Sequence, residues 1–320
     1  MILDGSVLDD TELMIFALRS LYQQYGYERF RMEKFEEYDL YAQHKDYLIS
    51  ENVITFTDMD GKLMALKPDV TLSVVKNLRD EPETLKKLCY SENVYRVSKG
   101  TGLFREIMQT GLECIGNVDR AAVGEVLLLA AKSLELCAAS FALEISNLDI
   151  LLCLLDDAVT EDEQRAATLK CIAEKNPAGV AELCRKAGVP AEKAEALQEL
   201  MKLYGPAASV LPRLRTLCAG RGVDAAVDTL EDVLRVLEEN GFAGRVQMDF
   251  SSVSNMNYYN GILFNGFVEG VPDSVLSGGQ YDTLMRRMGK ASKAVGFAVY
   301  LDRLERIGGS NFRGTVFQSA

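Results

Sequence analysis

The stretch Asn255–Leu284 constrains the fold of this 320-residue chain more than any other part of it. Residues 258–264 and 266–269 are rich in aromatic and β-branched side chains, which predicts two strands with turn-forming residues around them. The pair Gly278-Gly279 predicts a turn, and a helix is expected from about Asp282. The chain therefore contains a hairpin-like β unit close to its C-terminal end.

Side chains of the first of these strands should alternate between the two faces of a sheet. One face would carry Tyr258, Asn260 and Ile262, and the other would carry Tyr259, Gly261 and Leu263. Adjacent tyrosines beside asparagines suit the wall of a polar pocket, because a buried phenol needs a hydrogen-bond partner. Ordinary strand packing explains the same pattern, so the stretch alone leaves both interpretations open.

Composition narrows the class of protein. The formal net charge is −12 without a long run of one sign, which disfavours nucleic-acid binding because phosphate contacts depend on Lys and Arg. No basic segment followed by an apolar run opens the chain, so we expect no signal peptide. No apolar run reaches the length of about 18 residues that a membrane span needs.

Cysteine and histidine usage narrows the possible chemistry further. The seven cysteines are scattered and unpaired in sequence, which predicts reduced, mostly buried thiols and a cytoplasmic location. His44 is the single histidine, so a His-rich metal site is excluded. We expect no metal and no cofactor.

The order of predicted elements indicates an α+β fold. Hairpin signals, such as Asp60-Gly61 between two short apolar runs, precede residue 155, and further strands follow residue 243. Between them, residues 156–242 are rich in Ala, Leu, Glu and Lys, which predicts an all-α insertion without strands. We therefore expect an antiparallel sheet flanked by helices, built from residues 1–155 and 243–320 and interrupted by a helical insertion.

Five motifs, carried by six segments of the sequence in the same order, resemble a known family. YGYERFRMEKFEEYDLY and TFTDMDGKLMALKPDVT resemble the opening of the histidyl-tRNA synthetase catalytic domain, and VYRVSKGTGLFREIMQTGLECIG resembles motif 2 of class II synthetases. NMNYYNGILF with SGGQYDTL resembles the histidine-specific segment, and VGFAVYLDRL resembles motif 3. The resemblance covers nearly the whole chain, and it implies the class II synthetase fold.

The resemblance also implies a binding site for histidine. In the synthetases, an acidic residue and a threonine hold the ammonium group of the amino acid, and the corresponding residues here are Asp69 and Thr71. A carboxylate suits an ammonium ligand. Gln109 and Glu113 of the motif 2 segment are four residues apart on one strand, so their side chains should lie on the same face of the sheet. The candidate histidine-binding residues are Asp69, Thr71, Arg96, Gln109, Glu113, Tyr258 and Tyr259.

Several positions depart from the synthetase pattern on the nucleotide side. Ser98 replaces a glutamate of motif 2, Ser254 replaces an arginine that promotes adenylate formation, and Asn257 replaces an aspartate. Tyr300 stands where motif 3 has a glycine, so its ring should intrude on the adenine side, whereas the arginine of motif 3 is retained as Arg303. Because the sequence ends soon after motif 3, we expect no C-terminal anticodon-binding domain.

This combination resembles short members of the ATP phosphoribosyltransferase regulatory subunits, which are synthetase paralogues of histidine biosynthesis. The resemblance implies a non-catalytic subunit, a hetero-oligomer with the short-form catalytic subunit, feedback regulation by L-histidine and a homodimer within the complex. The net charge and the lack of a long apolar run predict no binding to nucleic acid or membranes. Two alternatives remain open on the sequence alone: a histidine-activating or histidyl-tRNA synthetase-like enzyme, and a free-standing histidine-binding protein.

Overall fold

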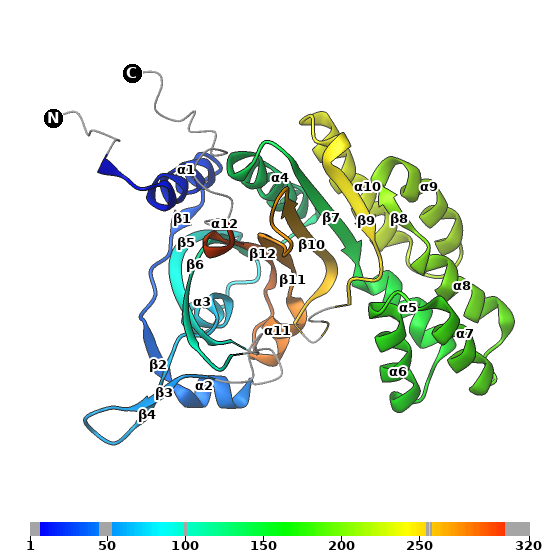
Figure 1. The fold of residues 1–320 in the computed structure, drawn as a ribbon, viewed down its shortest axis with the longest axis horizontal. Coiled ribbons are helices and arrows are strands. Elements are labelled where there is room, and N and C mark those ends of the chain that lie inside the picture. The colour runs from blue at the N-terminus through cyan, green and yellow to red at the C-terminus, as the bar shows by residue number, and fades with distance from the viewer. Residues whose placement is uncertain (1–6, 45–52, 99–100, 254–255, 257, 305–320) are drawn as a thin grey trace.

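The computed structural model describes residues 7–44, 53–98, 101–253, 256 and 258–304. Figure 1 shows a sheet with helices on its faces and, beside it, a group of helices formed by the middle of the chain. Within the described ranges, no helix is long and apolar enough to cross a membrane.

The central feature is a nine-stranded sheet in the order β1-β5-β6-β12-β11-β10-β7-β9-β8. The six strands from β5 to β7 pair antiparallel, which confirms the predicted pairing for the centre of the sheet. Towards the edges, β1 pairs parallel with β5 and β7 pairs parallel with β9. The strands are β1 Glu28–Arg29, β5 Lys86–Val97, β6 Phe104–Gly116, β7 Phe141–Asn147, β8 Tyr204–Pro206, β9 Val246–Asp249, β10 Asn260–Val268, β11 Leu276–Gln280 and β12 Lys293–Tyr300.

Helices cover the sheet on both faces. On one face, α1 packs against α4, and both contact strands of the sheet. Asp9 caps α1 through a reciprocal pair of hydrogen bonds with Glu12, and Asp119 caps α4. The helices outside the middle of the chain are α1 Asp10–Gln24, α2 Tyr38–Gln43, α3 Val70–Asn77, α4 Arg120–Cys137, α11 Asp282–Arg287 and α12 Leu301–Leu304.

A separate three-stranded sheet, in the order β2-β4-β3, contains the hairpin that Asp60-Gly61 predicts. Its strands are β2 Phe35–Glu37, β3 Thr55–Thr57 and β4 Leu63–Leu66, and Gly61 adopts a positive φ of 83° in the turn. The hairpin projects away from the middle helices in Figure 1. Directly after β4, the chain reaches Asp69 at the start of α3.

The middle of the chain is mainly helical, as its composition predicts. Its helices are α5 Leu148–Ala158, α6 Asp162–Ala173, α7 Pro177–Lys186, α8 Ala191–Met201, α9 Ala207–Cys218 and α10 Asp224–Glu239, followed by the 3-10 helix η3 Ala243–Arg245. The expectation of no strand is wrong in one place, because β8 pairs with β9 at the edge of the large sheet. Gly205, with a φ of 116°, lies within this short strand.

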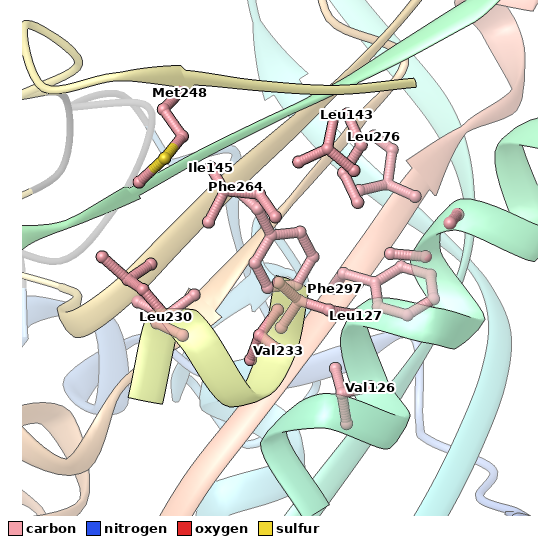
Figure 2. Close-up of a cluster of buried hydrophobic side chains, with 14 of the residues drawn as sticks. Val126, Leu127, Leu143, Ile145, Leu230, Val233, Met248, Phe264, Leu276 and Phe297 are labelled. Atoms are coloured by element: carbon pink, nitrogen blue, oxygen red, sulfur yellow. The ribbon is translucent and has the colours of Figure 1, made fainter. Parts of the chain in front are cut away.

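The main hydrophobic core joins these helices to the sheet. Figure 2 shows side chains from α4, α10 and the strands β7, β9, β10, β11 and β12 meeting in one cluster, with Phe264 of β10 at its centre. Phe264 and Phe297 lie at 6.2 Å with their rings 68° apart, an edge-on arrangement that aromatic pairs favour. All seven cysteines are free, and five of them are buried, which confirms the predicted thiols.

The stretch 255–284 differs from its prediction in two respects. One continuous strand, β10, replaces the two strands expected, with Asn265 and Gly266 inside it. Gly278 and Gly279 lie within β11 and form no turn. Neighbouring side-chain and backbone atoms leave no room for a Cβ at either position, which is why glycine is required there. The helix from Asp282 is confirmed.

Candidate functional site

All seven residues of the predicted histidine-binding set line a single cavity on the face of the large sheet. They come from the start of α3, from β5 and β6, and from the segment that leads into β10. The set comprises Asp69, Thr71, Arg96, Gln109, Glu113, Tyr258 and Tyr259. Segments distant in sequence therefore converge at one place, although their role in binding histidine stays a prediction.

Helix α3 positions the two residues expected to meet an ammonium group. Asp69 is its N-cap residue, and its carboxylate accepts a hydrogen bond of 2.9 Å from the backbone N–H of Leu72. Thr71 lies in the first turn, and its hydroxyl donates to the carboxylate of Glu113 at 2.7 Å. Burial raises the pKa of Asp69, against the opposing influence of the nearby Arg96 guanidinium.

Strand β6 contributes Gln109 and Glu113 on the face that the spacing predicts. Glu113 is 1% exposed, and its carboxylate accepts hydrogen bonds from the Thr71 hydroxyl at 2.7 Å and the Tyr281 hydroxyl at 2.6 Å. Burial raises the pKa of Glu113 to about 8, although both hydrogen bonds act in the opposite direction. Near neutral pH, this carboxyl therefore binds a proton in the absence of a cation.

Two further polar side chains of the cavity are the guanidinium of Arg96 and the amide of Gln109. Arg96 donates from Nε to the carbonyl of Pro68 at 2.9 Å. The side-chain amide nitrogen of Gln109 is buried and has no hydrogen-bond partner within the described part of the chain. A buried donor without a partner is costly, so a ligand that offers an acceptor would satisfy it. Two carboxyls, a guanidinium and a free amide donor suit a zwitterionic ligand.

Tyrosines form much of the wall. Tyr258 and Tyr259 lie with ring centroids 4.7 Å apart, and the ring of Tyr281 lies 6.1 Å from that of Tyr258. The expected division of Tyr258 and Tyr259 between opposite faces is wrong, since both line the cavity. The reason is that β10 begins only at Asn260, and its register with β11 shifts directly after that residue, so strict alternation does not reach the tyrosines.

Glycines allow these side chains to lie directly on the sheet. A Cβ on Gly296 would lie 1.9 Å from a carboxylate oxygen of Glu113, and one on Gly279 would lie 2.7 Å from the ring of Tyr259. A Cβ on Gly111 would lie 2.6 Å from the Tyr90 hydroxyl and 2.2 Å from a backbone oxygen. Close approach, and not an unusual φ, is therefore what requires glycine here.

The space between these side chains is small. Its volume is about 30 Å³, which is room for about two water molecules.

The residues that depart from the synthetase pattern lie in different places relative to the cavity. Tyr300 lines the cavity, as expected of a ring that intrudes on one side of the site. Ser98 lies outside the cavity, where its backbone pairs with Leu103 across the β5–β6 connection. Ser254 and Asn257 fall outside the described residues.

Sequence reasoning missed three polar residues of the wall: Tyr90, Ser277 and Tyr281. Tyr281 had a usable signal, because it belongs to the SGGQYDTL segment that carries part of the resemblance. Tyr90 had none, since it precedes the motif 2 segment in an ordinary strand sequence. Within the described ranges, no three His, Cys, Asp or Glu side chains are grouped so as to hold a metal ion.

Comparison with known proteins gives the same assignment. A sequence model of the family described as histidyl-tRNA synthetase matches residues 8–304. The chain is 30% identical over 293 residues to an ATP phosphoribosyltransferase regulatory subunit from Clostridium kluyveri, covering 89% of this chain and 74% of that relative.

Solved structures with the same fold agree. A protein from Bacillus halodurans, described as an ATP phosphoribosyltransferase regulatory subunit/histidyl-tRNA synthetase, has a TM-score of 0.81 and 25% identity, covering 96% of this chain and 82% of that one. A chain of the ATP phosphoribosyl transferase (HisG:HisZ) complex from Thermotoga maritima has a TM-score of 0.72 and 20% identity, covering 91% and 97%. The chain therefore belongs to the histidyl-tRNA synthetase family, and within it to the ATP phosphoribosyltransferase regulatory subunits.

Proposed function

We propose that this protein is a non-catalytic regulatory subunit of ATP phosphoribosyltransferase, needed for the first step of histidine biosynthesis. The similarity to a regulatory subunit over 89% of the chain carries this proposal. The short-form catalytic subunit is the proposed partner, in a cytoplasmic hetero-oligomer in which this chain forms a homodimer. A structure with the same fold comes from a HisG:HisZ complex, which supports an assembly of this kind.

The absence of catalysis by this chain is part of the proposal. Ser98 and Ser254 stand at positions where the synthetases have charged residues, and the Tyr300 ring occupies part of the cavity. We expect no histidine-dependent exchange of pyrophosphate into ATP. Such exchange by the purified protein would show that it is an activating enzyme.

Histidine is the proposed feedback ligand of the cavity. Its ammonium group would meet the carboxylate of Asp69, and its imidazole would lie near Glu113 among the tyrosines. The buried carboxyl of Glu113 supports this arrangement, because it receives two hydrogen bonds but has no cation beside it within the described part of the chain. A ligand that carries positive charge would complete the group.

The activity of the short-form catalytic subunit tests the regulatory role. Activity is measured with and without this protein across a titration of L-histidine. We expect the protein to activate the catalytic subunit and histidine to reverse the activation. If a folded protein and a competent partner give no change in rate, the regulatory role is refuted for that pair.

Calorimetry on the isolated chain tests the histidine site. Glu113→Ala should weaken histidine binding by about 1.5–3 kcal/mol, the contribution of a hydrogen bond to a charged group. Glu106→Ala is the matched control, because Glu106 lies on the same strand but is exposed and outside the cavity. Equal affinities for wild type and Glu113→Ala would remove Glu113 from the site.

A further inference from the structure

We propose that a second cavity, at the end shared by α4 and α10, binds a small oxyanion, namely the phosphate or carboxylate group of a metabolite. The cavity has a volume of about 250 Å³, and its polar lining residues are Lys132, Glu135, Asn240 and Arg245. A water molecule needs about 10–15 Å³ of such space, so an ion of several heavy atoms has room there. The cavity shares no lining residue with the candidate histidine site, and the two proposals are therefore independent.

Two cations line this cavity without a carboxylate partner. Lys132 and Arg245 are both partly buried, and neither forms an ion pair within the described part of the chain. By contrast, the ammonium of the partly buried Lys87 lies 2.7 Å from a carboxylate oxygen of Glu125. Withdrawing a cation from water is costly unless a negative group lies beside it. An anionic ligand would supply the missing negative charge.

The guanidinium of Arg245 is held in place at the wall of this cavity. Its carbon lies 5.1 Å from the centroid of the Phe141 ring, and Nη2 donates to the carbonyl of Ala139 at 3.1 Å. Phe141 packs in turn against Phe242, with the ring centroids 6.1 Å apart, and both rings are buried. A guanidinium has five N–H donors in a planar fork that suits a carboxylate or a phosphate. Donors of Arg245 therefore remain for a ligand.

The helix ends at the cavity oppose an anion, because the carbonyl end of a helix carries partial negative charge. Donors of the chain already engage carbonyls at both ends: Arg245 donates to Ala139 beyond α4, and the N–H of Phe242 donates to the carbonyl of Leu237 of α10 at 2.8 Å. Capping of a helix end explains Arg245 without a ligand. It does not explain Lys132, which makes no hydrogen bond, ion pair or ring contact with the described residues.

Calorimetry at constant ionic strength, with inorganic phosphate and succinate as separate probes, tests the site. We expect saturable binding of at least one probe, and the probe that binds more tightly tells phosphate esters from carboxylates as the ligand class. Lys132→Ala should weaken binding at least about tenfold, as the loss of a hydrogen bond to a charged group does. Lys293→Ala is the matched control and should leave binding unchanged, because it removes the same charge from an exposed lysine outside both cavities.

Glu135 provides a test of opposite sign. It lies one turn after Lys132 on α4, lines the cavity and forms no ion pair within the described part of the chain. Glu135→Gln removes a negative charge beside the bound anion and should tighten binding about two- to fivefold.

Three results would overturn the oxyanion site. The first is no saturable binding of either probe to the folded protein, and the second is equal weakening by Lys132→Ala and Lys293→Ala. The third is displacement of the probe by excess L-histidine, which would place the probe in the other cavity. If Lys132→Ala does not fold, Glu135→Gln decides, and unchanged or weaker binding by that variant refutes the site. Failure of histidine itself to bind refutes only the histidine site.

Discussion

At the scale of single residues, Glu113 dominates the chemistry of the cavity. Its carboxyl is almost fully buried, receives hydrogen bonds from Thr71 and Tyr281, and lies near the second buried carboxyl of Asp69. Burial disfavours the charged form more than the two hydrogen bonds favour it, and this balance raises the pKa of Glu113 to about 8. The ligand-free protein therefore carries a proton in the cavity that an incoming cation would release.

This raised pKa predicts a specific pH dependence of stability. A glutamate in water has a pKa of 4.5, whereas Glu113 in the folded protein has a pKa of about 8, so the folded state binds the proton more tightly than the unfolded state. Its contribution to the free energy of unfolding is fully present below the unfolded pKa and is lost as pH rises through the folded pKa, with a slope of at most about 1.4 kcal/mol per pH unit. Glu113→Gln removes this contribution.

Urea unfolding of wild type and Glu113→Gln at pH 5.5 and pH 8 measures the effect. The stability of the variant relative to wild type should improve at the higher pH, because only the wild type loses the contribution of the protonated carboxyl. An equal difference between the two proteins at both pH values would contradict the raised pKa.

The residues of the cavity could be predicted to the extent that motif spacing determines their geometry. Gln109 and Glu113 lie four residues apart on a strand, so their shared face followed from periodicity alone. The face on which Tyr258 and Tyr259 lie could not be predicted from periodicity, because the start of β10 and its register shift depend on pairing with β11. The small volume of the cavity depends on side-chain packing between α3, β5, β6, β11, β12 and the segment before β10, which no local sequence pattern records.

At the scale of elements, the sequence predicted the hairpins and long helices but misjudged the glycines of β11. Gly278-Gly279 is an ordinary turn signal, and propensity alone places it in a loop. In the structure, Phe264, Phe297 and Tyr259 approach the two glycines so closely that no Cβ fits. Tertiary packing therefore overrides the local turn signal. In the sequence, a glycine pair that is required by close packing cannot be told from a glycine pair that is required by a turn.

Gly296 on β12 provides a test of the same principle. Its Cβ would lie 1.9 Å from a carboxylate oxygen of Glu113 and 2.5 Å from the carbonyl oxygen of Leu112, and the carbonyl belongs to backbone that cannot move alone. Gly296→Ala should lower the free energy of unfolding by about 1–3 kcal/mol, as overpacking does. Chemical denaturation measures the loss.

Gly244→Ala is the matched control for this substitution. A Cβ on Gly244 would meet no atom within 4 Å, so the expected change in stability is within about 0.5 kcal/mol. Equal effects of the two substitutions would show that the loss arises from the chemistry of replacing glycine and not from the close packing at Glu113.

At the scale of the whole molecule, composition suggested a helical insertion between two parts of the sheet, whereas the hydrophobic core crosses that division. Buried side chains of α10, such as Leu230 and Val233, belong to the same cluster as Leu127 of α4 and Phe264 of β10 (Figure 2). Strand β8 also joins the large sheet through β9. Composition could indicate a helical segment, but it carries no information about whether those helices pack against the sheet.

A shared core predicts that the helices of residues 156–242 and the sheet unfold together. Leu230 is fully buried, and Leu230→Ala should lower the free energy of unfolding by about 2–5 kcal/mol. Far-ultraviolet circular dichroism follows all helices, including those of residues 156–242, whereas tyrosine fluorescence follows mainly the rest of the chain, because there is no tryptophan and Tyr204 is the single tyrosine in residues 156–242. Both signals should shift to the same lower urea midpoint in the variant. A helical signal that shifts while the fluorescence transition stays at the wild-type midpoint would show that residues 156–242 unfold as an independent unit.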